Sequence, residues 1–200
     1  MEFLPIARAL ISVTDKSSII EFGSALHQAG VELVSTGGTM RQLTQAGLPV
    51  RSVNEITGFP EILGGRVKTL HPNVHAGVLA DKDNPEHMQT LQDHHIAPFD
   101  LICVNLYDFG KAVAQNQSVR EAVEEIDIGG PTLLRAAAKN FHSVCVVPGP
   151  HWYPRIRQEI QDNNGTVGMS IRQQCAAETF AQVSRYDAMI ADYLRPVQEQ

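Results

Sequence analysis

Short, mostly apolar runs spaced along the chain constrain its fold more than any other feature of the sequence. Each run has the length of a strand, and the gaps between them hold patterns with an apolar residue every three or four positions, as in amphipathic helices. Strands that alternate with helices favour parallel pairing, so we expect one α/β layer structure with a mainly parallel sheet, helices on its faces and additional C-terminal helices. The predicted strands are Ala7–Val13, Val31–Val34, Leu48–Val53 (at a sheet edge), Asp100–Leu106 and Val144–Val147, and His75–Ala80 is also strand-like.

Pairs of polar residues three positions apart indicate where several of the helices start. A Ser or Thr followed by Glu or Gln three positions later is the pattern of a capping box, in which the two side chains bond free N–H groups of the first turn. The predicted boxes are Ser18 with Glu21, Thr39 with Gln42, Ser118 with Glu121, and Ser170 with Gln173.

The composition is that of a globular protein without a nucleic-acid or membrane surface. The formal net charge is −6 and no run of Lys or Arg occurs, which argues against nucleic acid as a partner. No apolar run has the length of a membrane span, and the first residues do not form a signal peptide. Three widely spaced cysteines fit free thiols in a reducing compartment rather than a zinc site. We therefore expect a cytoplasmic protein with one domain over residues 1–200.

The stretch Gly64–Gly77, GGRVKTLHPNVHAG, places four potential cations among glycines, a proline and small residues. Because Arg66 and Lys68 are of types seldom buried without partners, the stretch is either a solvated basic turn or a loop that approaches an anionic ligand. His71 and His75 are four positions apart, but a proline lies between them and no third metal ligand is evident. We expect packing near a ligand, not a metal.

The turn Ser35–Thr39, STGGT, is a second candidate for contact with an anion. A strand, a Gly-rich turn and a helix start together place backbone N–H groups and the positive end of the helix dipole at one point. The hydroxyls of Ser35, Thr36 and Thr39 are available there as further donors. The turn matches neither GxGxxG nor GxxxxGK[ST], which argues against dinucleotide and P-loop sites, whereas a plain connector stays possible. The pattern predicts a phosphate-sized anion site.

Two more positions are candidates because of where they stand relative to the predicted elements. Tyr107 follows the strand Asp100–Leu106, and ligands of open α/β sheets bind beyond the carboxyl ends of strands. A tyrosine that covers the core is the alternative. Asp127 stands before two glycines at the start of a helix, where an acid either belongs to a site or simply caps the helix.

Taken together, the motifs resemble one family: the IMP cyclohydrolase domain of the bifunctional purine-biosynthesis enzyme, whose other domain is AICAR transformylase. The resemblance implies a methylglyoxal-synthase-like fold and the closure of FAICAR to IMP with loss of water, the last step of de novo purine biosynthesis, catalysed by an enzyme of the hydrolase class. It also implies a homodimer and neither metal nor organic cofactor. The matching segments, in the family's order, are SVTDKS, STGGT, ITGFPEILGGRVKTLHPNVHAG, NLY, IDIGGPTLLRAAAKN and, near the end, AAETF followed by YD and I.

The resemblance also implies which residues act on the substrate. It points to Lys68, Tyr107, Asp127 and Lys139 as catalytic, and their chemistry suggests the roles: Asp127 would hold or accept the carboxamide proton, and Lys139 would orient Asp127 or polarise the formyl oxygen. Lys68 and Tyr107 would supply positive charge and a proton for the departing oxygen. The implied substrate-binding residues are Ser12, Thr14, Lys16, Thr36, Gly37, Gly38 and Thr39 at the phosphate, Arg66 and Thr69 at the base or phosphate, and Asn105 near the base.

The chain departs from the family pattern in two ways. Asp108 replaces the proline that usually follows the tyrosine, which leaves the geometry of Tyr107 open. The transformylase domain is absent, so we expect it either on a separate chain or in a longer protein from which this domain is taken.

Two other functions remain open. One is an effector-binding module like the domain of the same fold in carbamoyl-phosphate synthetase, which would need neither Lys68 nor the pair Asp127 and Lys139. The other is methylglyoxal synthase, whose small pocket would not require the IDIGGPTLLRAAAKN segment.

Overall fold

The computed structural model describes residues 1–106, 109–110 and 118–195. Its centre is a five-stranded sheet in the order β4-β3-β2-β5-β6, and all of its strand pairs are parallel. The strand β5 is buried along its whole length, as expected for a strand with helices on both faces. The predicted fold class and parallel sheet are confirmed. The strands are β2 (Arg8–Ser12), β3 (Glu32–Ser35), β4 (Val50–Ser52), β5 (Leu101–Val104) and β6 (Cys145–Val147).

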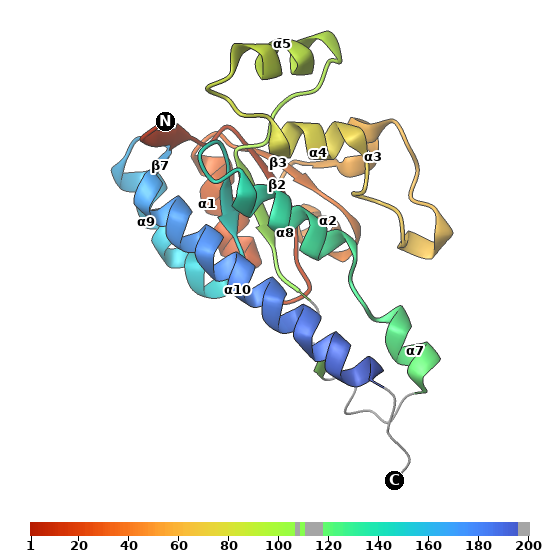
Figure 1. Cartoon of the computed structure of the whole chain (residues 1–200). Helices are drawn as coiled ribbons and strands as arrows, with labels where there is room; N and C mark the ends of the chain where they lie inside the picture. Colours follow the sequence, from red (N-terminus) through yellow and green to blue (C-terminus); the bar gives the residue numbers. More distant parts are fainter. Residues whose placement is uncertain (107–108, 111–117, 196–200) are drawn as a thin grey trace.

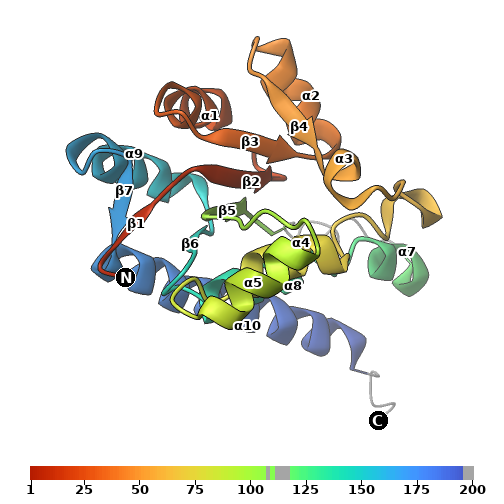
Figure 2. The ribbon, with the colours of Figure 1, turned by 90° about the horizontal axis from the view of Figure 1, so that it is seen from above.

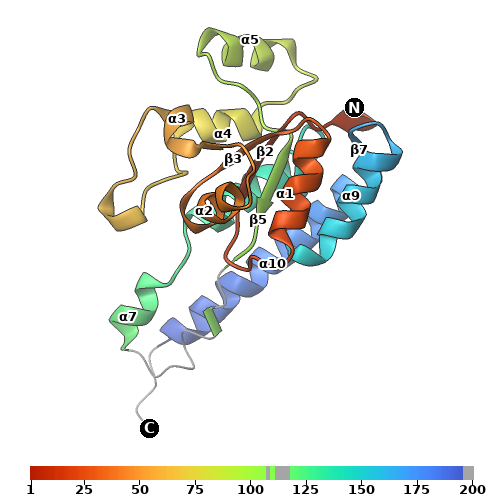
Figure 3. The ribbon, with the colours of Figure 1, turned by 180° about the vertical axis from the view of Figure 1, so that it is seen from behind.

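Helices cover both faces of this sheet (Figures 1 and 2). One face carries α1 (Ile19–Gln28), α2 (Gly37–Gln45) and α9 (Tyr153–Asp162), which lie in front of the sheet in Figure 3. The other face carries α4 (Pro72–Leu79) and α8 (Gly129–Lys139). The long helix α10 (Met169–Leu194) packs along α8 and against β6. The remaining elements are the short helices α3 (Val53–Thr57), α5 (Pro85–Asp93) and α7 (Val119–Glu124), and the 3₁₀ turns η1 (Leu63–Gly65) and η2 (Pro150–Trp152).

The strand order places a crevice at the middle of the sheet. From β2 the chain moves outward through β3 to β4, and it then returns to add β5 and β6 on the other side of β2. The chain that leaves β2 crosses one face of the sheet, and the chain that leaves β5 crosses the other face. A gap therefore opens between the carboxyl ends of these two neighbouring strands. In open α/β sheets this reversal point is where ligands bind.

The predicted helix starts are correct in part. Ser118 and Glu121 form the expected capping box at α7. Ser18 precedes α1 with a left-handed backbone (φ 54°) and makes no capping bond, so the predicted box is wrong there. The helix α2 begins at Gly37 after Thr36, and α10 begins at Met169, so the boxes predicted at Thr39 and Ser170 are also wrong.

The strand-like segment His75–Ala80 is instead helical, because α4 runs from Pro72 to Leu79. Proline suits the first position of a helix, and the His71 side chain caps the same end by accepting a bond from the Asn73 N–H (3.1 Å). The segment is thus part of a short helix in which Val74 and Val78 are fully buried.

A small second sheet, not predicted from the sequence, joins the first residues of the chain to the segment just before α10. β1 (Phe3–Pro5) pairs antiparallel with β7 (Thr166–Gly168), so that Phe3 lies opposite Gly168. Beside it, the fully buried Arg172 donates hydrogen bonds to the carbonyls of Met1 and Glu2, and also to two carbonyls beyond the end of α8. Within the described ranges, no helix is both long and apolar enough to cross a membrane.

Candidate functional site

A cavity of about 760 Å³ opens beyond the carboxyl ends of β2, β3 and β5, at the reversal point of the sheet. Its walls come from these strand ends, the start of α2, residues 63–70, α7 and the start of α8. The structure brings every predicted binding residue to this cavity, together with two of the four predicted catalytic residues. The lining includes Ser12, Thr14, Lys16, Thr36, Gly37, Gly38, Thr39, Arg66, Lys68, Thr69, Asn105 and Asp127.

One end of the cavity is cationic. The first N–H groups of α2 open into it at Gly37 and Gly38. Two lysines lie over this helix end: Lys68 Nζ is 3.6 Å from where a Cβ on Gly37 would stand, and Lys16 Cε is 3.5 Å from the same point on Gly38. Because Gly37 has φ +56°, any other residue there would have a strained backbone. Two ammonium groups and a helix N-terminus together form an anion site.

Two of the three hydroxyls expected to serve this anion site are already used inside the fold. Ser35 Oγ donates to the Ile11 carbonyl (2.6 Å), and Thr39 Oγ1 both donates to the Val13 carbonyl and accepts from the Val13 N–H (3.0 Å each). The expectation that Ser35 and Thr39 offer free donors is therefore wrong. These side chains instead hold the end of β2 against the start of α2, and Thr36 remains as the hydroxyl at the turn.

Asn105 fixes the neighbouring loop rather than presenting its amide to the cavity. Its Oδ1 accepts from the Thr14 N–H (2.7 Å), the Thr14 hydroxyl (2.8 Å) and the Asp15 N–H (3.1 Å), and its Nδ2 donates to the Asp15 carbonyl (2.9 Å). The side-chain amide thus makes four bonds to one loop. This bonding sets the position of Thr14 and of Lys16 beyond it.

The other end of the cavity holds a carboxylate at the start of α8. Asp127 Oδ1 accepts from the Gly130 N–H (2.9 Å), so the helix-capping alternative is present in the structure. A Cβ on Gly130 would overlap the carboxylate, which therefore needs glycine at that position. Burial raises the pKa of Asp127 above its ordinary value, although bonds from the Gly130 and Gly129 N–H groups oppose the shift. Capping and chemistry are compatible, because the carboxylate also lines the cavity.

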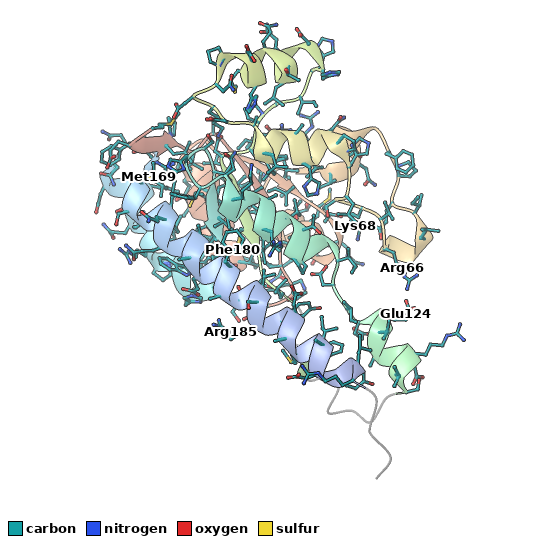
Figure 4. The ribbon with its side chains drawn as sticks, viewed as in Figure 1. Arg66, Lys68, Glu124, Met169, Phe180 and Arg185 are labelled. Carbon is teal, nitrogen blue, oxygen red and sulfur yellow. The ribbon has the colours of Figure 1, made fainter. Side chains whose placement is uncertain are left out.

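Arg66 and Lys68 each form an ion pair that the sequence did not predict. Lys68 Nζ lies 2.8 Å from Glu61, and Arg66 Nη2 lies 2.7 Å from both carboxylate oxygens of Glu124 on α7. Figure 4 shows Arg66 and Glu124 pointing toward one another from opposite walls. Glu124 is 58 positions from Arg66 in the sequence, and no local pattern could have paired them. An anionic ligand would compete with both carboxylates.

The other two predicted catalytic residues are not among the described residues that line the cavity. Tyr107, with its neighbour Asp108, lies outside the described residues. Lys139 is exposed on the last turn of α8, whereas the first turn of that helix lines the cavity. At a rise of about 1.5 Å per residue, the Cα atoms of Gly129 and Lys139 are about 15 Å apart. Within this one chain Lys139 therefore lies away from Asp127, and the role that the resemblance implies for Lys139 stays a prediction.

Of the two histidines at the start of α4, His71 serves the fold, whereas the buried Nε2 of His75 has no hydrogen-bond partner among the described residues. His71 caps α4, and His75 lies one turn further along, half-buried, with a pKa lowered by burial. Among the residues that the structure describes, no three His, Cys, Asp or Glu side chains are grouped so that they could hold a metal ion.

Comparison with known proteins places this geometry in a family. The MGS-like domain model matches residues 18–132, and the AICARFT/IMPCHase bienzyme model matches residues 137–200. The crystal structure of ForH superposes with a TM-score of 0.81 and 31% sequence identity, covering 93% of this chain and 97% of that one.

Curated relatives agree with both models. The bifunctional purine biosynthesis protein PurH of Rippkaea orientalis is 53% identical over 92% of this chain, and that of Halalkalibacterium halodurans is 50% identical over 94%. The chain spans 36% and 37% of the length of these two relatives. The chain therefore belongs to the MGS-like domain family, and its last third continues into the AICARFT/IMPCHase family.

Proposed function

We propose that this chain is an IMP cyclohydrolase, which closes the second ring of a purine by converting FAICAR to IMP with loss of water. Its similarity over more than nine-tenths of its length to bifunctional purine biosynthesis proteins supports this assignment. The observation that carries the proposal is the cavity itself, which joins a cationic helix start at one end to a partly buried carboxylate at the other.

These two ends match the two ends of the substrate. FAICAR is a ribonucleotide 5′-monophosphate whose imidazole carries a carboxamide next to a formamido group. The phosphate fits the start of α2 with Lys16 and Thr36, because backbone N–H groups and ammonium ions bind a dianion well. The imidazole and its two substituents then reach toward Thr69 and Asp127. A cavity of about 760 Å³ has the size of known small-molecule sites.

The chemistry needs a base and a donor, and the cavity offers both. The carboxamide nitrogen attacks the formyl carbon to form the new C–N bond, and the former formyl oxygen then leaves as water. Asp127 takes the carboxamide proton, for which a pKa raised by burial suits it. Lys68 stands at the start of α2 beside Glu61, and once released from Glu61 it is proposed to turn toward the formyl oxygen and to supply positive charge there, while Lys16 stays at the phosphate. Tyr107 is proposed to assist by resemblance alone. The reacting groups share one ring, so holding the formyl rotamer provides a proximity effect. No metal or organic cofactor is required.

The test is direct. Purified protein is mixed with FAICAR, and the formation of IMP is followed by its ultraviolet absorbance and verified by chromatography. We expect turnover by this chain alone. Tight binding of nucleoside monophosphates without turnover would favour an effector-binding module, and release of phosphate from dihydroxyacetone phosphate would favour methylglyoxal synthase.

We further propose that the protein acts in the cytoplasm as a homodimer, with a transformylase activity supplied in the same or another chain. The three cysteines are free and buried, as in proteins of reducing compartments. The helix α10 exposes Phe180, Met189 and Leu194, which is apolar surface that an interface would cover. Light scattering is expected to give about twice the 21.9 kDa of one chain; a monomer at micromolar concentration would contradict the homodimer.

A further inference from the structure

A hydroxyl group of α10 reaches the start of α8. Tyr186 lies in the C-terminal half of α10 and is only 4% exposed. Its Oη accepts a hydrogen bond of 2.8 Å from the main-chain N–H of Asp127. The two residues are 59 positions apart. A buried tyrosine needs a partner for its hydroxyl, and here that partner is the backbone of the residue whose carboxylate lines the cavity.

The same ring also touches the segment that follows β5. Phe109, which is fully buried, packs edge-on against Tyr186 with ring centroids 6.4 Å apart. Tyr186 thus contacts two of the segments that lie around the carboxyl end of β5, one through its ring and one through its hydroxyl. If packing alone were needed, phenylalanine would serve; the hydroxyl has a separate task.

That task concerns the main chain of Asp127, between the end of α7 and the start of α8. The Asp127 N–H precedes α8 and is not bonded within that helix, and in the described part of the chain Tyr186 Oη is its only recorded acceptor. On the other side of the same residue, the carboxylate is held by the Gly130 N–H. Asp127 is therefore fixed from both sides, once by its own helix and once by α10.

We propose that Tyr186 is a positioning residue for the ring closure: its hydroxyl holds the Asp127 main chain, and through it the carboxylate, at the cavity. This inference rests on the proposed function. It also explains why the C-terminal helix belongs to the enzyme, because Tyr186 lies in residues 137–200, which only the second family model matches, whereas Asp127 lies in the first.

The test compares two tyrosine-to-phenylalanine variants in the FAICAR assay. Tyr186→Phe keeps the ring and removes the acceptor, so kcat is expected to fall about tenfold, as for the loss of one buried hydrogen bond, with KM changed less than about twofold. Tyr193→Phe is the matched control, because its ring packs on the same Phe109 (5.5 Å) without a recorded bond to Asp127. It is expected to keep wild-type kcat.

A double-mutant cycle separates positioning from simple stability. If Tyr186 acts through Asp127, Tyr186→Phe adds no further loss of kcat in an Asp127→Asn background. An additive loss, an unchanged kcat in the single variant, or equal losses in Tyr186→Phe and Tyr193→Phe would each overturn the inference. Absence of IMP formation by the wild type would instead overturn the proposed function, so the two failures are distinguishable.

Discussion

Asp127→Asn is expected to lower kcat about 1,000-fold, which is within the usual contribution of a positioned general base. The amide keeps the shape of the side chain, and its oxygen can still accept from the Gly130 N–H, but it cannot take a proton from the carboxamide. The effect should appear in kcat and much less in KM, because the phosphate of the substrate binds at α2 and not at Asp127. Initial rates across a range of FAICAR concentrations measure both.

The same variant is expected to be at least as stable as the wild type at neutral pH. Burial raises the pKa of Asp127 in the folded state, so the folded protein binds this proton more tightly than the unfolded chain does. The stabilising contribution of the residue is fully present below its unfolded pKa of about 3.9 and is lost as the pH rises through the folded value. At pH 7 the wild type therefore bears the cost of a buried charge, which asparagine lacks.

Urea unfolding measures this second effect. The free energy of unfolding of Asp127→Asn should equal or exceed that of the wild type at pH 7, and the two should converge under acidic conditions. Asp162→Asn is the matched control, because Asp162 is exposed on α9 and does not line the cavity. A variant that is inactive because it is unfolded, or one that keeps near wild-type kcat, would contradict the role given to Asp127.

Lys68→Met is expected to lower kcat/KM by about 100- to 1,000-fold, the range seen when one donor to a developing negative charge is removed. Lys68 Nζ stands beside the start of α2 and is paired with Glu61. Methionine has a similar length without the charge, so the loss reports on electrostatics more than on packing. Steady-state kinetics together with calorimetric titration of IMP divide the loss between chemistry and binding.

Lys68→Arg separates charge from proton transfer. Arginine keeps the positive charge but does not give up a proton in proteins. If Lys68 only attracts an anion, Lys68→Arg should restore much of the affinity and rate; if it donates a proton, Lys68→Arg should stay as slow as Lys68→Met. Unchanged kcat/KM in both variants would remove Lys68 from the mechanism. The same pair of substitutions at Lys139 tests whether that residue takes part, which at present only the resemblance implies.

The sheet could be predicted because its strands are apolar on both faces. Runs such as LICV need no knowledge of their partners to be recognised as buried strands, and the alternation with helices favours parallel pairing. The anion site at Ser35–Thr39 could also be predicted, because the turn joins a strand to a helix start, whereas the full set of binding residues was named from the family resemblance. The strand ends of a parallel sheet meet at one edge, so a local motif already implies a shared location.

What the sequence could not predict depends on distant partners. Thr39 has the pattern of a capping residue, but its hydroxyl bonds the backbone at Val13. The pairs of Arg66 with Glu124 and of Tyr186 with Asp127 join residues almost sixty positions apart. The misassigned α4 has a different cause: its eight residues are too few for the helical period to stand out, and the proline that starts it resembles an interruption.

The pairing of β1 with β7 has a consequence for how the protein is made. The first strand emerges from the ribosome long before its partner, because Phe3 lies opposite Gly168, and Arg172 follows still later. While the chain is being synthesised, β2, β3 and β5 can already assemble, but the residues before them have nothing to pair with. Contacts of such long sequence separation form slowly. We therefore expect β1 to pair with β7 last, after the central sheet has formed.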